Sequence, residues 1–383
     1  MLPKVFLDKT SLYRFAIQAV FLLVVIAAVA SAVITARANV DAQGLSGGFH
    51  FLERATGWSY SFSLIDQSVD DPYWRTLGIG FMNTLFLGLV FIGLATFLGF
   101  IIGAGRDSAN FAVGGASWIF VHLFRNIPLI LQLMFWYAVL IHLPSPNQAL
   151  SIFDAAFLTN RGLHVPLPNV PAAIGFGLGV VAVASAVLLG NAFLKGVIRL
   201  PIFMAGLMWA ALNVGLISLG GLLFAPEDTA SFDLPRLEGL RHVGGLYVSV
   251  ELVAMIVAAV LYGAAYIAEV VKGGLRGVPR EAVEAGRALG MQEDLIWVRI
   301  KLPLALRSIV PPLGNQWIYL VKATTVGMAI GFSDLFMIIS TSITQSGQTL
   351  ELIGILVGAF LLINFSLARI VRFINGSLQL KSN

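Results

Sequence analysis

The sequence Glu284-Ala285-Gly286-Arg287-Ala288-Leu289-Gly290, followed after nine residues by Ile300-Lys301-Leu302-Pro303, decides how the rest of the chain is interpreted. It lies within the longest charged run of the chain, residues 278–313. Pro279 can begin a helix, because its missing N–H costs nothing in the first turn. Gly290 can end that helix, because glycine readily takes the left-handed conformation found at helix C-termini.

Two faces are expected on this helix. One carries small and apolar residues spaced at i, i+3, i+4 and i+7, namely Ala282, Ala285, Gly286 and Leu289. The other carries charges that support neighbours of opposite sign modestly, namely Arg280, Glu284 and Arg287. A second short helix, beginning at Glu293 and Asp294, is expected to reach Ile300 before Pro303 redirects the chain. The stretch predicts a polar helix–turn–helix between two apolar segments.

The composition is that of a membrane protein. The chain has 383 residues, of which 58% are hydrophobic and only 11% charged, and its mean hydropathy is +0.87. A soluble domain carries about 25% charged residues. There are no cysteines, which excludes disulfides and thiolate metal sites, and the five histidines show no metal-binding spacing. No P-loop sequence is present, so the chain does not bind ATP by that route.

Eight apolar segments are long enough to cross a hydrocarbon core of about 30 Å. They are expected at 15–36, 77–105, 116–143 (interrupted at 125–128), 172–193, 202–225, 244–271, 310–331 and 351–371. A cleaved signal peptide is the alternative for the first segment, but its apolar run is longer than a typical signal core. The proline-rich segment 144–171 is expected to be a loop with room for a short surface helix.

The positive charges predict an orientation for these spans. With the N-terminus inside, seventeen of the 24 Lys and Arg residues fall in inner segments, six fall in outer loops, and Lys322 lies within a span. Positive residues accumulate on the cytoplasmic side of membrane proteins. Both termini and the Glu284 stretch are therefore expected to be cytoplasmic.

The spaced pattern around Glu284 resembles the EAA loop of ABC-importer permeases, the cytoplasmic element that docks on the ATPase subunits. Other stretches resemble the polar amino-acid branch of that family, and the resemblance covers about residues 76–140 and 244–375. These stretches are Asn83-Thr84-Leu85, Phe124-Arg125-Asn126-Ile127-Pro128, Ala268-Glu269-Val270-Val271-Lys272-Gly273-Gly274, Pro303-Leu304-Ala305-Leu306-Arg307, Pro311-Pro312-Leu313-Gly314-Asn315 and Lys322-Ala323-Thr324-Thr325.

The resemblance implies an all-α, type I permease core with extra helices. The division it predicts is an extra helix and outer loop at 1–75, the first part of the core at 76–143, an inserted loop and membrane hairpin at 144–243, and the remaining core at 244–383. The coupling loop lies at 273–303. Long permeases with such additions resemble the first membrane subunit of general L-amino-acid importers, which pairs with a second, related permease; a homodimer stays open.

The function that the resemblance implies is ATP-driven import of amino acids, over a broad range, across the bacterial inner membrane by alternating access. The implied partners are an ATP-binding subunit dimer at the cytoplasmic loop, a second permease, a periplasmic substrate-binding protein and membrane lipid, with no nucleic acid. No catalytic, cofactor or metal site is expected on this chain, since ATP and Mg²⁺ belong to the ATPase.

Two other classes of protein are the alternatives. An ion-coupled secondary transporter needs carboxylates deep in the membrane, whereas Glu251 and Glu269 lie near the two ends of one span. Glu269 is expected either to reach the interface beside Lys272 or to act in gating or coupling. A membrane enzyme or assembly factor, the other class, needs a catalytic cluster, which the sequence does not present.

Two sets of residues are candidates for function. The candidates for ATPase coupling are Arg280, Glu281, Glu284, Ala285, Gly286, Arg287, Leu289 and Gly290. The candidates for the translocation pathway are Asn315, Lys322, Thr324 and Thr325.

Lys322 is the most deeply placed charge. If its span starts near Pro312, ten residues place Lys322 about 15 Å into the bilayer. A charge there is costly and is expected to face the bundle interior. The alternative is that Lys322 caps backbone carbonyls or pairs with an acid of the partner permease. In the second span, Gly88, Gly93, Gly99 and Gly103 indicate close helix packing.

Overall fold

A computed structural model describes residues 9–42, 48–170, 181, 185, 202–224 and 232–378, and most of these residues are helical. Apart from residues 181 and 185, the expected span at 172–193 lies outside the described residues. The helices are α1 (Lys9–Ala42), α2 (Tyr73–Gly105), α3 (Phe111–Asn126), α4 (Leu129–Ile141), α6 (Ile202–Phe224), α7 (Val250–Arg276), α8 (Arg280–Ala288), α9 (Glu293–Ile296), α10 (Leu302–Lys322), α11 (Leu335–Ser346) and α12 (Thr349–Leu378).

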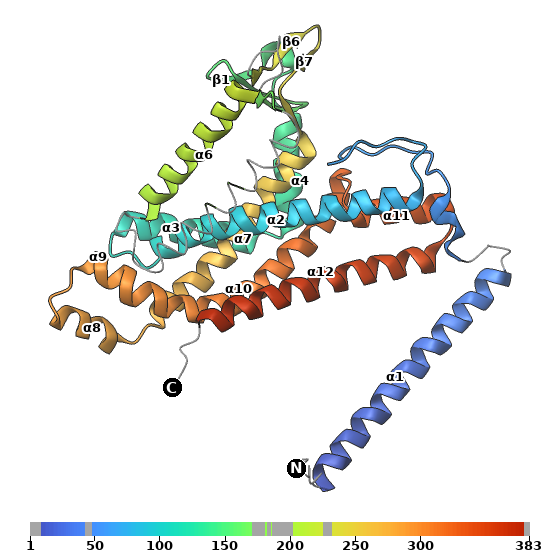
Figure 1. Cartoon of the computed structure of the whole chain (residues 1–383), viewed down its shortest axis with the longest axis horizontal. Helices are drawn as coiled ribbons and strands as arrows, with labels where there is room; N and C mark the ends of the chain where they lie inside the picture. The colour runs from blue at the N-terminus through green and yellow to red at the C-terminus, as the bar shows by residue number, and fades with distance from the viewer. Residues whose placement is uncertain are drawn as a thin grey trace.

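Four helices of the described chain are long and apolar enough to span a membrane, within α1, α2, α7 and α12, and six if each of two bent pairs counts as one span. The count of eight therefore stays a prediction. Helix α1 lies away from the bundle (Figure 1), and its side chains, where described, are almost all exposed. Its apolar surface fits a lipid environment, as expected for a membrane helix.

The centre of the bundle is the contact between α2 and α7, with α10 and α4 packed against α7 (Figure 1). Glycines let the two backbones approach closely. A Cβ atom on Gly99 would lie 2.6 Å from Ile267, and one on Gly103 would lie 2.6 Å from Val271. Gly88 likewise contacts Val321 of α10. Close packing is thus confirmed for these three glycines, but it is wrong for Gly93, where a Cβ would meet nothing within 4 Å.

The interrupted third span is two helices, α3 and α4, which meet at 102°. Ile127 is extended, as the residue before a proline prefers to be, and Pro128 is the N-cap of α4. The side-chain amide of Gln132 donates to the carbonyls of Phe124 and Ile127 at 2.7 and 2.9 Å, so the break leaves those carbonyls bonded. The interruption expected at 125–128 is therefore confirmed, and the preference of the pre-proline residue explains why the chain turns there.

The expectation that Pro303 redirects the chain is also wrong. Helix α9 continues through a π-helical turn, η3 (Trp297–Lys301), directly into α10. The N–H of Leu302 donates to the carbonyl of Trp297. A π turn changes the hydrogen-bond register, so Pro303 can enter without the break that its missing N–H causes in a regular helix. Pro311 and Pro312 also lie inside α10.

The segment 144–171, expected to be a loop, contains four strands in the described chain, and four more lie between residues 232 and 249, just before α7 begins at Val250. A four-stranded antiparallel sheet has the order β1-β2-β3-β8, and two further pairs join β4 to β5 and β6 to β7. The strands are β1 (Leu150–Ile152), β2 (Ala156–Thr159), β3 (Gly162–Val165), β4 (Leu167–Pro168), β5 (Phe232–Asp233), β6 (Arg236–Glu238), β7 (Arg241–Val243) and β8 (Leu246–Ser249). The prolines flank or end these strands instead of interrupting them. The expected surface helix is a single 3₁₀ turn, η2 (Pro146–Gln148).

Three further segments complete the fold. A 3₁₀ turn, η1 (Phe49–Glu53), precedes α2, and a longer one, η4 (Ala323–Ile330), follows α10. Helix α11, which no sequence pattern had indicated, follows η4 after a bend of 50°. Its apolar residues Leu335, Ile338 and Ile339 are buried against α2 and α12.

The α2–α7 contact predicts a difference between two valine substitutions on one helix. Gly99→Val places a side chain against Ile267 and is expected to destabilise the fold by about 1–3 kcal/mol, as overpacking does. Gly93→Val is the control, because its side chain enters open space while the change in helix propensity is the same. Thermal unfolding of the purified protein in detergent checks this. Equal loss of melting temperature in both variants would contradict the packing account.

Candidate functional site

Helix α8 ends in a left-handed glycine. Gly290 has φ +74°, the N–H of Met291 donates to the carbonyl of Gly286 at 3.1 Å, and the N–H of Gly290 donates to that of Arg287 at 2.9 Å. These two bonds define a Schellman motif, which satisfies the last carbonyls of a helix. Gly290 therefore sets the turn between α8 and α9.

Helix α8 packs on the following helical segment, most closely at Gly286. Gly286 is buried, and a Cβ on it would lie 2.7 Å from Ile300 and 3.1 Å from Ile296. Of the other residues on its predicted small face, Ala282 is half-buried, whereas Ala285 is exposed and Leu289 is 81% exposed. One side of α8 thus packs on the protein, and an apolar residue beside charged ones remains uncovered.

The charges of α8 pair differently from the expected pattern. The guanidinium of Arg287 donates to both carboxylate oxygens of Glu293, at 2.6 and 3.2 Å, and so bridges α8 and α9. These hydrogen bonds hold the pKa of Glu293 below its usual value. Among the residues with described side chains, Arg280 and Glu284 form no ion pair, and with Glu281 they lie exposed on α8. Three of its charged side chains are therefore free to meet a partner.

Ion pairs join the α8 region to the bundle. Asp107, just after α2, contacts Lys301 of η3 and lies 3.6 Å from Arg276 at the end of α7. Helix α2, the end of α7 and the segment that supports α8 are held together at this point. Because the Asp107 side chain is only 15% exposed, these contacts are partly shielded from solvent screening.

Glu269 of α7 makes a second set of pairs. Its carboxylate lies 2.7 Å from Arg106, whose side chain is 6% exposed, and 3.9 Å from Arg125 of α3. The Arg106 contact is an ion pair without hydrogen-bond alignment, since the Nη1 atom involved has no hydrogen-bond partner. Glu269 thus binds three helix ends together. These ion pairs give Glu269 a structural role beyond reaching the membrane interface beside Lys272. Its role in gating stays a prediction.

The pathway candidates do not all share one face of α10. Asn315 and Lys322 are exposed on the same face, seven residues apart, and Tyr319 lies between them. The ring of Tyr319 stacks on Tyr262 of α7 with centroids 5.7 Å apart, and its hydroxyl donates to that of Tyr262 at 3.4 Å. The strip therefore includes two tyrosines that were not among the residues predicted from the sequence. The spacing could have revealed this strip, because Tyr319 lies four residues after Asn315 and three before Lys322, on the same helix face.

The two threonines after Lys322 have other roles. Thr325 is half-buried, and its hydroxyl donates to the carbonyl of Lys322 at 2.8 Å. Thr324 is fully buried, and its hydroxyl donates to the carbonyl of Val321 and to Asp334. Thr324 therefore points away from the exposed strip, and its contacts are structural.

A buried polar cluster fixes the break between η4 and α11. Asp334 caps α11 by accepting from the N–H of Met337 at 2.9 Å, and the N–H of Leu335 donates to Thr84 at 2.9 Å. The side-chain amide of Asn83 donates to the carbonyls of Ser333 and Phe62 at 2.8 and 3.0 Å. The Asn83-Thr84 stretch thus holds this bend against α2 and the preceding outer segment. No sequence pattern had singled out Asp334.

Residues 95–379 match a family described as "Binding-protein-dependent transport system inner membrane component". The match covers well over half of the chain and includes both α8 and the α10 strip. The chain belongs to this family of transporter membrane subunits, and the helical permease fold expected from the sequence is confirmed.

Three curated relatives are similar along most of their length. The chain is 36% identical over 344 residues to the putative amino-acid ABC transporter permease protein YhdX of Escherichia coli K12, covering 88% of this chain and 86% of YhdX. It is 35% identical to the general L-amino acid transport system permease protein AapQ of Rhizobium johnstonii, covering 83% and 80%. It is 29% identical to the glutamate/glutamine/aspartate/asparagine transport system permease protein BztB of Rhodobacter capsulatus, covering 95% and 93%.

Proposed function

We propose that this chain is the membrane permease subunit of an ATP-driven importer that carries amino acids of several kinds across the bacterial inner membrane. Family membership supports the permease role, and the amino-acid substrates named for YhdX, AapQ and BztB support the cargo. The single structural observation that carries the proposal is α8, a short polar helix held to the bundle on one side and uncovered on the other. ATP and Mg²⁺ belong to separate subunits.

The uncovered side of α8 fits a groove on an ATPase. Leu289 offers an apolar anchor, which is costly to leave in water and gains on burial. Arg280, Glu281 and Glu284 surround it with charges that can fix its orientation. Because Gly286 places α8 directly on Ile296 and Ile300, a push on α8 meets packed side chains. The contact between this helix and an ATP-hydrolysing subunit is therefore the proposed input of energy.

The strip on α10 supports a second permease subunit. Lys322 is exposed in the single chain, and within the described parts of the chain no acid lies within ion-pair distance of it. A lysine ammonium facing lipid near the middle of a bilayer costs roughly 2.5–3.5 kcal/mol on insertion scales. A related subunit facing this strip removes that cost and encloses a polar route between the two chains. A periplasmic substrate-binding protein then delivers the amino acid from outside.

An ion-coupled transporter is less well supported. Such a protein needs a carboxylate that an ion can reach. Asp334 is buried, but its oxygens accept hydrogen bonds from Met337 and Thr324, which gives the carboxylate a structural use. Glu269 is likewise engaged by Arg106 and Arg125.

The proposed orientation follows from the excess of positive residues in the segments assigned to the inside. The absence of cysteine allows single thiols to be introduced. A thiol at Leu240, in the turn between β6 and β7, is expected to react with an impermeant reagent in intact cells. One at Gln292, beside α8, is expected to react only after the membrane is opened. The reverse pattern would contradict this orientation and the docking role of α8.

Gly290 provides a test of the coupling role. Gly290→Val strains the left-handed residue by roughly 1–2 kcal/mol and is expected to leave the complex assembled with uptake lost or uncoupled from ATP hydrolysis. Gly290→Asn is the matched control, because asparagine tolerates this conformation and should retain most uptake. No neighbour lies within 4 Å of a Cβ at this position, so the contrast isolates backbone strain. Normal transport by Gly290→Val would show that α8 is not the coupling helix.

Lys322 tests the translocation strip. Lys322→Met keeps the length of the side chain and removes its charge, so it is expected to abolish uptake while the assembled complex remains. Lys322→Arg, which keeps the charge, is expected to retain part of the activity. Uptake of labelled amino acids into cells, with copurification of the ATPase as the assembly control, measures both. Unchanged uptake in Lys322→Met removes Lys322 from the pathway, and loss of the complex assigns it a structural role.

A further inference from the structure

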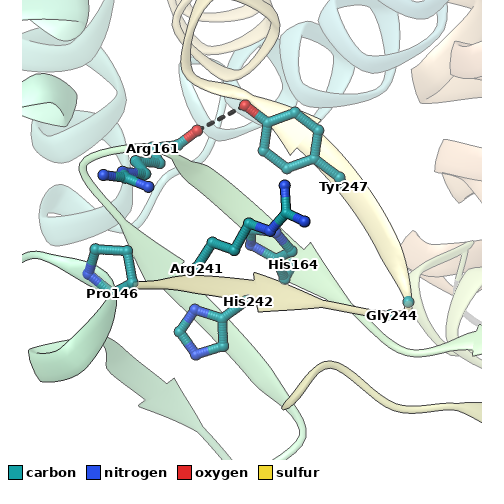
Figure 2. A pocket seen from close by; sticks show the side chains of 8 residues that line it. Pro146, Arg161, His164, Arg241, His242, Gly244 and Tyr247 are labelled. Atoms are coloured by element: carbon teal, nitrogen blue, oxygen red, sulfur yellow. Dashed lines mark hydrogen bonds between the residues drawn. The ribbon is translucent and has the colours of Figure 1, made fainter. Parts of the chain in front are cut away.

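A pocket of about 380 Å³ lies in the inserted strands, separate from the α10 strip. Its lining comes from elements distant in sequence, namely η2, the β2–β3 turn, β3, β7 and the β7–β8 turn with β8 (Figure 2). The volume falls within the range of about 300–1,000 Å³ typical of small-molecule sites. Because β8 runs directly into α7, the pocket lies at the end of α7 opposite α8.

Two arginines line this pocket without an acidic partner. Neither Arg161 nor Arg241 forms an ion pair with any acid in the described segments. The guanidinium of Arg161 donates to the carbonyl of Leu240 at 3.1 Å, which leaves further N–H groups available. Arg236, in the neighbouring strand β6 but outside the pocket, is instead paired with Glu238 at 2.7 Å.

Two buried histidines form part of the same lining. His164 and His242 are each 7% exposed, their rings lie 5.4 Å apart, and their Nδ1 atoms have no hydrogen-bond partner. Burial lowers the pKa of both imidazoles, and for His164 the neighbouring His242 adds to the effect. They are therefore neutral near pH 7, and the positive charge of the pocket comes from the arginines.

Tyr247 fixes part of the pocket wall through defined contacts. Tyr247 of β8 packs its ring 5.0 Å from that of His164, and its hydroxyl donates to the carbonyl of Arg161 at 2.8 Å, as Figure 2 shows. This bond ties the turn that carries Arg161 to β8. The pocket thus combines a fixed wall with two guanidinium groups that form no ion pair among the described residues, and the Nδ1 atoms of its histidines are buried without a hydrogen-bond partner there.

We propose that this pocket binds a small carboxylate compound of about the size of an amino acid, at a site separate from the translocation strip. Guanidinium groups match the two oxygens of a carboxylate and bind it through short, charge-assisted hydrogen bonds. Arg161 and Arg241 belong to different sheets, so a ligand bound by both joins the β1-β2-β3-β8 sheet to the β6–β7 pair. The pocket is a partly open hollow and not a flat surface, which favours a free small molecule over a flat protein contact.

The experiment measures binding of L-glutamate to the purified whole chain, with its copurifying partners, in lipid nanodiscs by titration calorimetry. Saturable binding is expected in the unaltered protein. Arg241→Gln is expected to raise Kd by roughly tenfold or more, because a hydrogen bond to a charged group is lost. Arg161→Gln is expected to act in the same direction. Arg236→Gln is the matched control and should bind normally.

Two further arms distinguish this pocket from the translocation strip and from a general anion site. Lys322→Met, which alters the translocation strip, should leave the binding unchanged, so failure of the transport proposal does not affect this result. Inorganic phosphate tests the other common oxyanion. The proposal is overturned if L-glutamate does not bind, if Arg241→Gln binds normally with an unchanged melting temperature, or if Arg236→Gln is equally impaired. Binding of phosphate alone would overturn the carboxylate assignment.

Discussion

The contact between α2 and α7 depends on Gly99 and Gly103 of α2. Because these residues have no side chain, Ile267 and Val271 of α7 lie directly against the backbone of α2. This contact fixes α7 within the bundle, and α7 in turn connects the two ends of the molecule. Its 27 residues extend for about 40 Å at 1.5 Å per residue. The strands with the arginine-lined pocket precede it directly, and α8 follows it after three residues.

Charged side chains are concentrated at the C-terminal end of α7, next to α8. Glu269 with Arg106 and Arg125, and Asp107 with Lys301 and Arg276, join three helices to the π-helical segment below α8. From that segment α10 continues without a break to Lys322. Through the contact of Gly286 with Ile300, α8 therefore packs on the helical segment that continues into the helix with the polar strip. Packed side chains and ion pairs thus connect α8 with the groups within the bundle.

The sequence predicted those elements whose signal is local. The end of α8 followed from Gly290, and the second, sixth and eighth apolar segments became α2, α7 and α12, because long apolar runs in a bilayer form helices. The strands were missed, since two to four residues are too few to show a period of two. The expectation that Pro303 redirects the chain was wrong because a π turn, which depends on the whole segment, accommodates this proline. The burial of Thr324 could not be predicted, because its hydroxyl bonds to Asp334, ten residues away across a bend.

The contact of α8 with an ATPase is the central claim, and site-specific crosslinking tests it most directly. A photoreactive amino acid at position 289, where Leu289 is 81% exposed, is placed in the intact complex, with one at exposed Leu240 as control. The account predicts a covalent product from position 289 with a protein that hydrolyses ATP, and none from position 240. The absence of that product from position 289, or its equal yield from position 240, would contradict it.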